Sequence, residues 1–198
     1  VGCGHNLHFI DPVSRRTLAI RPDITRQVGR IAVTRMAAAP RPLRLCYAGE
    51  VVRLSASALW PDREQRQIGA ELIGSDSVAA LCEVIGVALD ALAAAGVTGI
   101  TVDLTLPDLV ETLAASAFPL PDGQLAAVKA ELDAKDAGAL AALGADAYLP
   151  LIRATGAFDE AIEQLRAIDA GGALASRIAA LEAIAASIGP RATVTLDP

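Results

Sequence analysis

Short runs of apolar and β-forming residues, separated by turn residues, occupy much of the first third of the chain and are typical of β-strands. Two short runs of this kind, 8–11 and 17–21, flank a turn around Pro12 and predict a β-hairpin. Two longer runs, 43–53 and 65–74, predict a second pair of strands joined by a long loop. We therefore expect the first third of the chain to form antiparallel strands.

Apolar residues at helical spacing predict two helices around these strands. The first is expected over 23–39, where Pro40-Arg41-Pro42 ends it. Asp76 is expected to cap the second, a helix of about 19 residues that ends at Gly96. The positions expected to be buried are Ile24, Val28, Ile31, Ala32 and Met36 in the first helix, and Val78, Leu81, Cys82, Ile85, Leu89 and Leu92 in the second.

Short, alanine-rich helices interrupted by Gly and Asp dominate the rest of the chain. A strand over 99–106 and a helix over 107–117 come first, and the Pro-containing stretch 118–123 then marks a boundary. A last strand over 192–196 is expected to return to the main sheet. The helices predicted between these points are 124–132, 137–143, 148–154, 159–168 and 173–187.

Together these elements predict an α+β fold, in which an antiparallel sheet is flanked by helices and a small all-helical segment is inserted near the C-terminal end. The predicted domains are a core over 1–118, a helical insertion over 119–190 and a return strand over 191–198. A chain of 198 residues is long enough for such a core. Hydrophobic residues make up 53% but aromatic residues only 3%, so the core must consist of Leu, Ile, Val and Ala.

Charge and cysteine content narrow the class of protein. The net charge of −6 argues against a general nucleic-acid surface, which needs clustered Lys and Arg. The longest apolar stretches contain Asp, Glu or Gly every few residues, so none is expected to span a membrane. Cys3, Cys46 and Cys82 match neither a disulfide framework nor a zinc site, and Cys46 and Cys82 are expected to be buried thiols of a cytoplasmic protein.

Candidate ligand-binding groups lie on the two longer strands. Arg53 leaves the first strand, whereas Gln67 and Glu71 lie four residues apart on the second and therefore point to the same face. A cation, an amide and a carboxylate on one face can bind a small zwitterion. The alternatives are an Arg53 in solvent and a Glu71 that only pairs with an arginine. Because the sequence contains no motif for a metal ion, a phosphate-binding loop or a nucleophilic catalyst, we expect no cofactor and no catalytic residue.

The longer strands also carry a resemblance to a known family. They read YAGEVVR and, after the loop, DREQRQIGAELIG, which resembles motif 2 of class II aminoacyl-tRNA synthetases in its histidyl form. Upstream, FIDPVSRRTLAIRPDITRQVGRIA resembles the segment that precedes motif 2. The patterns Asp-Pro-x-Ser-x-Arg and Arg-Pro-Asp-x-Thr are closer to a non-aminoacylating paralogue, the regulatory subunit of short-form ATP phosphoribosyltransferase, which acts at the first step of histidine biosynthesis.

The resemblance implies roles for five residues. In histidyl-tRNA synthetases, the acid and the threonine at the positions of Asp23 and Thr25 hold the amino group of histidine, although the acid there is the longer glutamate. The arginine at Arg53 holds the α-phosphate of ATP and the carboxylate of the amino acid. The pair at Gln67 and Glu71 reads the amino and imidazole groups. A simpler interpretation of Asp23, that it caps the helix, stays open.

Departures from the synthetase pattern fall on the ATP side of the pocket. Ser55 stands where synthetases have a glutamate that contacts the adenylate region, and Gln65 stands where an aromatic ring stacks on adenine. The loop also lacks the Gly-Arg that helps to read the end of the tRNA. The resemblance thus implies a protein that senses histidine without activating it.

The expected function is that of a non-catalytic regulatory subunit, which activates the catalytic subunit of short-form ATP phosphoribosyltransferase and relays feedback inhibition by histidine. The implied partners are that catalytic subunit, a second copy of the chain in a homodimeric core, and histidine as effector. Two alternatives stay open: a divergent or truncated histidyl-tRNA synthetase, and a binding module that docks another partner through 124–187. The family's motif 1 and motif 3 segments are expected outside residues 1–198.

Overall fold

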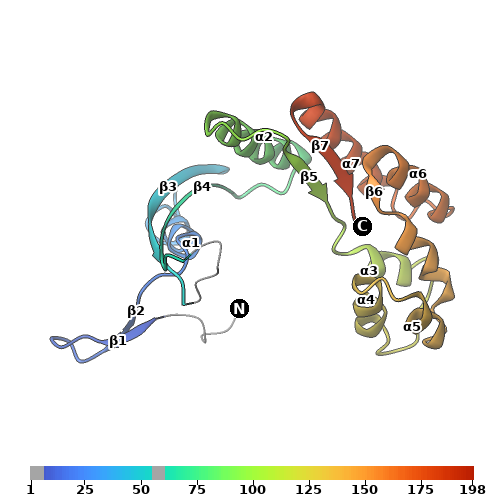
Figure 1. The fold of residues 1–198 in the computed structure, drawn as a ribbon, viewed down its shortest axis with the longest axis horizontal. Coiled ribbons are helices and arrows are strands. Elements are labelled where there is room, and N and C mark those ends of the chain that lie inside the picture. Colours follow the sequence, from blue (N-terminus) through green and yellow to red (C-terminus); the bar gives the residue numbers. More distant parts are fainter. Residues whose placement is uncertain (1–6, 55–60) are drawn as a thin grey trace. The chain divides into compact units, whose positions relative to one another are not determined.

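The computed structural model describes residues 7–54 and 61–198, and the chain divides into two units (Figure 1). We refer to residues 1–80 as the strand unit and to residues 81–198 as the helical unit. Paired strands dominate the first and helices the second. The predicted α+β class is therefore confirmed.

The strand unit begins with the predicted hairpin. β1 (His8–Ile10) pairs with β2 (Thr17–Ala19) in antiparallel fashion. The carboxylate of Asp11 shapes the turn, because its oxygens accept hydrogen bonds from the backbone N–H groups of Val13 and Ser14, each at 3.1 Å. A local side-chain bond thus sets the turn that the proline-containing sequence predicted.

β3 (Leu43–Val52) and β4 (Glu64–Ile73) form the second predicted pair. They are antiparallel, in a register that places Gly49 opposite Gln67. One face of this pair is half-buried, and Val51 on it is only 2% exposed; the other face is open to solvent. The alternation in the sequence therefore corresponds to one packed face and one exposed face.

α1 (Thr25–Val33) covers the packed face of β3 and β4. Ile24 and Val28 join Val51 in a small core. Ile31, which was expected to be buried, is 36% exposed instead. A single helix on a two-stranded ribbon buries only the narrow stripe that faces the strands, so its flanks stay in contact with water.

α1 ends at Val33, earlier than the predicted span of 23–39, and the side chain of Arg41 binds carbonyl groups at and beyond its end. The guanidinium of Arg41 donates hydrogen bonds to the carbonyl oxygens of Ala32, Met36 and Ala39 at 3.0, 3.1 and 2.9 Å. These bonds satisfy backbone acceptors that further helical turns would otherwise have to satisfy. The chain therefore reaches β3 through turns instead of helix.

α2 (Val78–Ala94) confirms the second predicted helix, but its cap differs from the prediction. The hydroxyl oxygen of Ser77 accepts a hydrogen bond from the backbone N–H of Ala80 at 3.2 Å, so Ser77 is the capping residue. Asp76 lies one residue too early for that role. Both residue types are good caps, and only the position at which the helix starts decides between them.

The buried stripe expected on α2 is only partly buried. Leu89 is 3% exposed, whereas Leu81 is 50% and Leu92 is 39% exposed. Helical spacing identifies an apolar face, but burial also requires a surface that packs against it. The exposure of Leu81 and Leu92 corrects the prediction on this point.

The helical unit contains a small sheet of its own. β5 (Thr101–Leu104) and β7 (Thr193–Leu196) pair in parallel, and β6 (Gly156–Ala157) pairs with β7 in antiparallel fashion, which gives the order β5-β7-β6. The predicted last strand exists, but its neighbours are β5 and β6 instead of strands of the β3–β4 pair. β6 was not predicted because two residues are too few to show a period.

Helices account for the rest of this unit. Those predicted at 124–132, 137–143, 159–168 and 173–187 are confirmed to within about two residues, which is the usual uncertainty of a helix end. The helix predicted at 148–154 is a 3₁₀ helix, because Pro150 has no N–H to donate. The observed spans are α3 (Leu109–Ala114), α4 (Leu125–Asp133), α5 (Ala137–Ala142), η2 (Asp146–Arg153), α6 (Phe158–Ile168), α7 (Ala175–Ile188) and η3 (Gly189–Arg191).

A continuous core holds the helical unit together. Leu113, Leu140 and Leu165 are fully buried, and the hydroxyl of the buried Tyr148 donates a hydrogen bond to the carbonyl oxygen of Phe118 at 2.7 Å. Burial raises the pKa of Tyr148, so the hydroxyl stays protonated as this bond requires. The predicted domain division into 1–118, 119–190 and 191–198 remains a prediction.

The structure also bears on the sequence predictions about the cysteines, membrane-spanning helices and metal sites. Cys46 is exposed on the outward face of β3 and Cys82 is half-buried, so the prediction of two buried thiols is wrong for Cys46. Cys3 lies outside the described residues. Among the described helices, none combines the length and the apolar character that a membrane crossing requires. Within residues 7–54 and 61–198, no group of His, Cys, Asp and Glu side chains is arranged to hold a metal ion.

Candidate functional site

Three of the predicted site residues meet where α1 begins against β4. The side-chain amide of Gln67 donates a hydrogen bond to Oδ1 of Asp23 at 2.8 Å, and its Oε1 accepts one from the backbone N–H of Ile24 at 2.9 Å. Oδ1 of Asp23 also accepts a hydrogen bond from the backbone N–H of Thr25 at 3.0 Å. Gln67 thus ties the start of the helix to the strand and orients the carboxylate of Asp23.

A fourth side chain completes this cluster. The hydroxyl of Tyr47 on β3 lies 3.0 Å from the hydroxyl of Thr25 and accepts a hydrogen bond from Gln67 at 3.4 Å. Its ring crosses the neighbouring strand over Gly69, where a Cβ atom would lie only 2.4 Å from the ring. Glycine at that position is therefore what allows the tyrosine to reach the cluster.

The electrostatics of the cluster favour an ionised acid. The hydrogen bond from Gln67, followed by the one from the backbone of Thr25, lowers the pKa of Asp23 below its ordinary value. Near neutral pH, Asp23 is therefore a carboxylate that can accept hydrogen bonds from an ammonium group. The alternative that Asp23 caps α1 holds in part: Ile24 occupies the cap position, but Asp23, one residue earlier, accepts a hydrogen bond from the backbone N–H of Thr25, the first residue of the helix.

Glu71 lies on the same face of β4 as Gln67, opposite Leu45 of β3. It is half-buried, and among the described residues its side chain has no hydrogen-bond or ion-pair partner. The alternative that Glu71 serves to pair with Arg53 is therefore not what this structure contains. A half-buried carboxylate without a partner remains available to a ligand.

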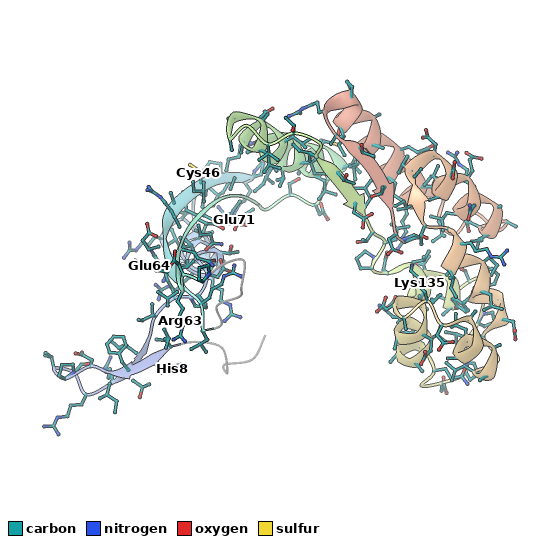
Figure 2. All side chains as sticks on the ribbon, viewed as in Figure 1. His8, Cys46, Arg63, Glu64, Glu71 and Lys135 are labelled. Atoms are coloured by element: carbon teal, nitrogen blue, oxygen red, sulfur yellow. The ribbon has the colours of Figure 1, made fainter. Side chains whose placement is uncertain are left out.

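Arg53 lies apart from the other predicted site residues. Its side chain is exposed, and its backbone N–H donates to the carbonyl oxygen of Arg63 at 2.9 Å, which extends the β3–β4 ladder toward the loop. Figure 2 shows Arg63 and Glu64 near the loop end of the pair and Glu71 farther along it. Arg53 lines a hollow of about 590 Å³ together with Pro61, Asp62, Glu64, Gln65 and Arg66.

The residues on the predicted ATP side fit the expectation only in part. Gln65 lies in the wall of that hollow and is half-buried, so a polar amide occupies the place where an aromatic ring was expected in synthetases. Ser55 lies outside the described residues. Within the hollow as described, no aromatic side chain offers a surface for stacking a base.

Sequence reasoning missed the part that Tyr47 and Arg21 play. Arg21 donates hydrogen bonds from Nε to the carbonyl oxygen of Glu50 at 2.7 Å and from Nη1 to Oε1 of Gln27 at 3.1 Å. Tyr47 lies two residues from Gly49, the residue opposite Gln67, and therefore points to the same face of the strand pair. A predicted strand register could have placed it near Gln67. Arg21 carried no such signal, because its contact with β3 depends on the fold.

The fold is that of a class II synthetase-like core. In the strand unit, an antiparallel pair of strands carries polar groups on one face, and a helix packs on the pair with its start bound to a strand. The family model described as "Histidyl-tRNA synthetase" matches residues 3–198. The chain therefore belongs to the histidyl-tRNA synthetase family.

Curated relatives within this family carry a more particular name. The chain is 42% identical to the ATP phosphoribosyltransferase regulatory subunit of Rhodospirillum centenum, over 89% of this chain and 42% of that protein. The proteins of the same name from Rhodospirillum rubrum and Paramagnetospirillum magneticum are 39% and 40% identical, over 98% and 96% of this chain and 52% and 51% of their own lengths. The chain thus spans about half the length of the curated relatives it matches.

Solved structures agree on the fold. An ATP phosphoribosyltransferase regulatory subunit/histidyl-tRNA synthetase from Bacillus halodurans superimposes with a TM-score of 0.76 at 23% identity, over 100% of this chain and 53% of that chain. A histidine–tRNA ligase subunit from Alicyclobacillus acidocaldarius gives a TM-score of 0.58 at 23% identity, over 98% of this chain and 62% of that chain. At this level of identity, the likeness establishes the fold alone.

Proposed function

We propose that this chain is part of a non-catalytic regulatory subunit, which activates the catalytic subunit of a short-form ATP phosphoribosyltransferase and relays feedback inhibition by histidine. The observation that carries the proposal is the hydrogen-bonded cluster of Asp23, Thr25 and Gln67 beside a strand that has Gln65 on its ATP side. In this proposal an amino-acid site is kept, while the described residues of the adjoining hollow offer no aromatic surface for adenine. The names of the curated relatives support the regulatory role over that of a synthetase.

In this proposal the effector is histidine, and the cluster binds its ammonium group. Asp23 supplies the negative charge, and the hydroxyl of Thr25 supplies a second acceptor. Gln67 positions Asp23, and Glu71 accepts a hydrogen bond from the imidazole. Arg53 supplies a cation toward the loop end of the strands. None of these groups takes part in a covalent step, because the ATP and phosphoribosyl chemistry belongs to the catalytic partner.

Feedback inhibition requires that the histidine site and the partner's active site be coupled. If histidine lowers the affinity of the complex for its substrates, the substrates lower the affinity for histidine by the same factor. The proposed assembly contains the catalytic subunit and at least two copies of the regulatory chain, and it lies in the cytoplasm. The names of the relatives support the catalytic partner, and the family resemblance motivates the other elements of the proposal.

Reconstitution tests the proposed function. The full natural chain is mixed with the catalytic subunit from the same organism, and phosphoribosyl-ATP formation is followed with and without histidine. We expect formation to rise when the chain is added and to fall when histidine is then supplied. A rate that is indifferent to the chain would contradict the proposal.

The second candidate function is that of a divergent histidyl-tRNA synthetase. The description of the matching family model favours it. Adenylate formation is the reaction that separates the two candidates. In a pyrophosphate-exchange assay with histidine and ATP, the regulatory proposal predicts no exchange above background. Histidine-dependent exchange would favour the synthetase.

A further inference from the structure

A second arginine, Arg21, lies closer to the cluster than the predicted Arg53. Its backbone carbonyl oxygen accepts a hydrogen bond from the N–H of Val52 at 3.1 Å, which fixes this segment to β3. Its half-buried side chain then crosses β3 over Gly49, where a Cβ atom would lie 2.7 Å from Nη2. A Cβ atom at that point would force the guanidinium to shift.

The register of the strands places this guanidinium beside Gln67. Gly49 pairs directly with Gln67 across the β3–β4 ladder, and directly opposed residues have Cβ positions about 5 Å apart. Asp23 accepts its hydrogen bond from the same Gln67. The guanidinium of Arg21 and the carboxylate of Asp23 therefore both lie beside the Gly49–Gln67 pair.

Arg53 does not share this position. It lies four residues beyond Gly49, which corresponds to about 13 Å along a strand. Val51 lies between them on the same face and is buried under Ile24 and Val28 of the helix side. A packed apolar side chain thus separates Arg53 from the cluster.

The positive charge of Arg21 also has no negatively charged partner among the described residues. Its recorded partners are a backbone carbonyl oxygen and the side-chain amide of Gln27, both neutral, and within the described part of the chain it forms no ion pair. A half-buried guanidinium bound only to neutral acceptors keeps its full attraction for an anion. A carboxylate is the anion whose geometry its planar donors match.

We propose that Arg21 receives the carboxylate of the amino-acid ligand, while Asp23 receives its ammonium group. The two charges of an α-amino acid sit on one carbon atom, so a site for it needs a cation and an anion side by side, as Arg21 and Asp23 are around Gln67. Arg21 is then the residue that distinguishes histidine from its decarboxylated amine, histamine. The assignment rests on the proposed function, because it concerns the same site.

The test compares histidine with histamine as ligands of the full natural chain by calorimetry. The wild type is expected to bind histidine at least about 10-fold more tightly, which corresponds to about 1.4 kcal/mol. Arg21→Gln is expected to abolish that preference and to leave histamine binding in place. Arg26→Gln, an exposed control on α1 with the same change of charge, is expected to keep the preference, and Arg53→Gln tests the competing assignment of the carboxylate to Arg53.

Two further variants separate a binding role from a structural one. Arg21→Lys keeps the positive charge and is expected to restore part of the preference, whereas Gly49→Ala displaces the guanidinium without changing any charge and is expected to weaken it. Histamine binding reports in each case that the site is folded. A preference that survives Arg21→Gln, or one that disappears in Arg53→Gln, would overturn the assignment. A wild type that binds neither ligand would instead overturn the proposed function, and the assignment with it.

Discussion

The strand unit and the helical unit use their polar side chains in different ways. In the helical unit, exposed charges pair with one another: Lys129 lies 2.7 Å from Glu111, and Arg177 bonds both carboxylate oxygens of Asp108. The hydrogen bond from Arg177 lowers the pKa of Asp108. These charges have opposite charges as their partners, which satisfies them within the unit.

In the strand unit, by contrast, charged groups near the start of α1 bond to neutral partners. Asp23 accepts hydrogen bonds from an amide and a backbone N–H, and Arg21 donates to an amide and a backbone carbonyl oxygen. Glu71 has no partner among the described residues. Charges that are oriented but not neutralised are what a zwitterion requires, so the comparison supports the proposed ligand site in the strand unit.

The largest expected effect concerns the core of the helical unit. Leu165→Ala removes a fully buried side chain and should lower the free energy of unfolding by about 2–5 kcal/mol. Ile68→Ala, at a β4 side chain that is 76% exposed, should change it by less than about 0.5 kcal/mol. Urea denaturation of both variants measures the difference. Equal losses in the free energy of unfolding would contradict the conclusion that the buried core of the helical unit provides stability.

The next effect concerns the link between helix and strand. Gln67→Ala leaves the N–H of Ile24 without its partner, removes one of the two hydrogen bonds to the carboxylate of Asp23, and should cost about 1–3 kcal/mol. Gln65→Ala, two residues away on the same face, breaks only a 3.5 Å contact with the carbonyl oxygen of Asp62 and should cost less. Amide hydrogen exchange across 24–33 reports the loss. Unchanged protection in Gln67→Ala would show that the link does not hold the helix.

A pH dependence follows from Asp23. Its pKa is lower in the folded protein than in the unfolded chain, so its stabilising contribution is present above the ordinary value of 3.8 and is lost as the pH falls through the lowered pKa. Gln67→Ala removes the main cause of the shift, and the pKa of Asp23 should move back toward its ordinary value. Carboxyl NMR titration of both proteins measures this change, and an identical pKa in the two would contradict it.

The smallest effect is expected for an exposed ion pair. Arg166 contacts Glu163 and Glu182 on the surface of the helical unit. Arg166→Ala should lower the free energy of unfolding only slightly, and far less than Leu165→Ala does, since solvent screens such pairs. High salt should remove most of that difference in urea denaturation. A loss as large as that of Leu165→Ala would mean that surface charges, and not the core, hold this unit together.

Elements that depend on local sequence patterns were predicted correctly, whereas features that depend on contacts between distant residues were not. Extended, β-forming runs on either side of a loop located β3 and β4, and apolar residues at helical spacing located α6 and α7, because these elements have a local pattern. The end of α1 was missed because Arg41 supplies hydrogen bonds from beyond the helix, and Cys46 was misplaced because an apolar neighbourhood in sequence does not say which face of a strand is outward.

The candidate site was predictable to the degree that it follows a motif. Asp23, Thr25 and Gln67 were found through their resemblance to a known pattern, and the structure brings them together. Arg21 and Tyr47 were not found, because their contacts cross β3 or β4 at glycine positions that only the strand register connects. A contact between elements distant in sequence has no local pattern that reveals it.

The central claim is that the cluster around Asp23 senses histidine on behalf of a catalytic partner. The most direct test is a histidine titration of the reconstituted complex, which follows phosphoribosyl-ATP formation for the wild type, for Asp23→Asn and for the exposed control Asp159→Asn on α6. Loss of the charged hydrogen bond to the ammonium group predicts that Asp23→Asn needs about 10- to 100-fold more histidine for half-inhibition, with no change for Asp159→Asn. Inhibition curves that coincide for all three proteins would contradict the claim.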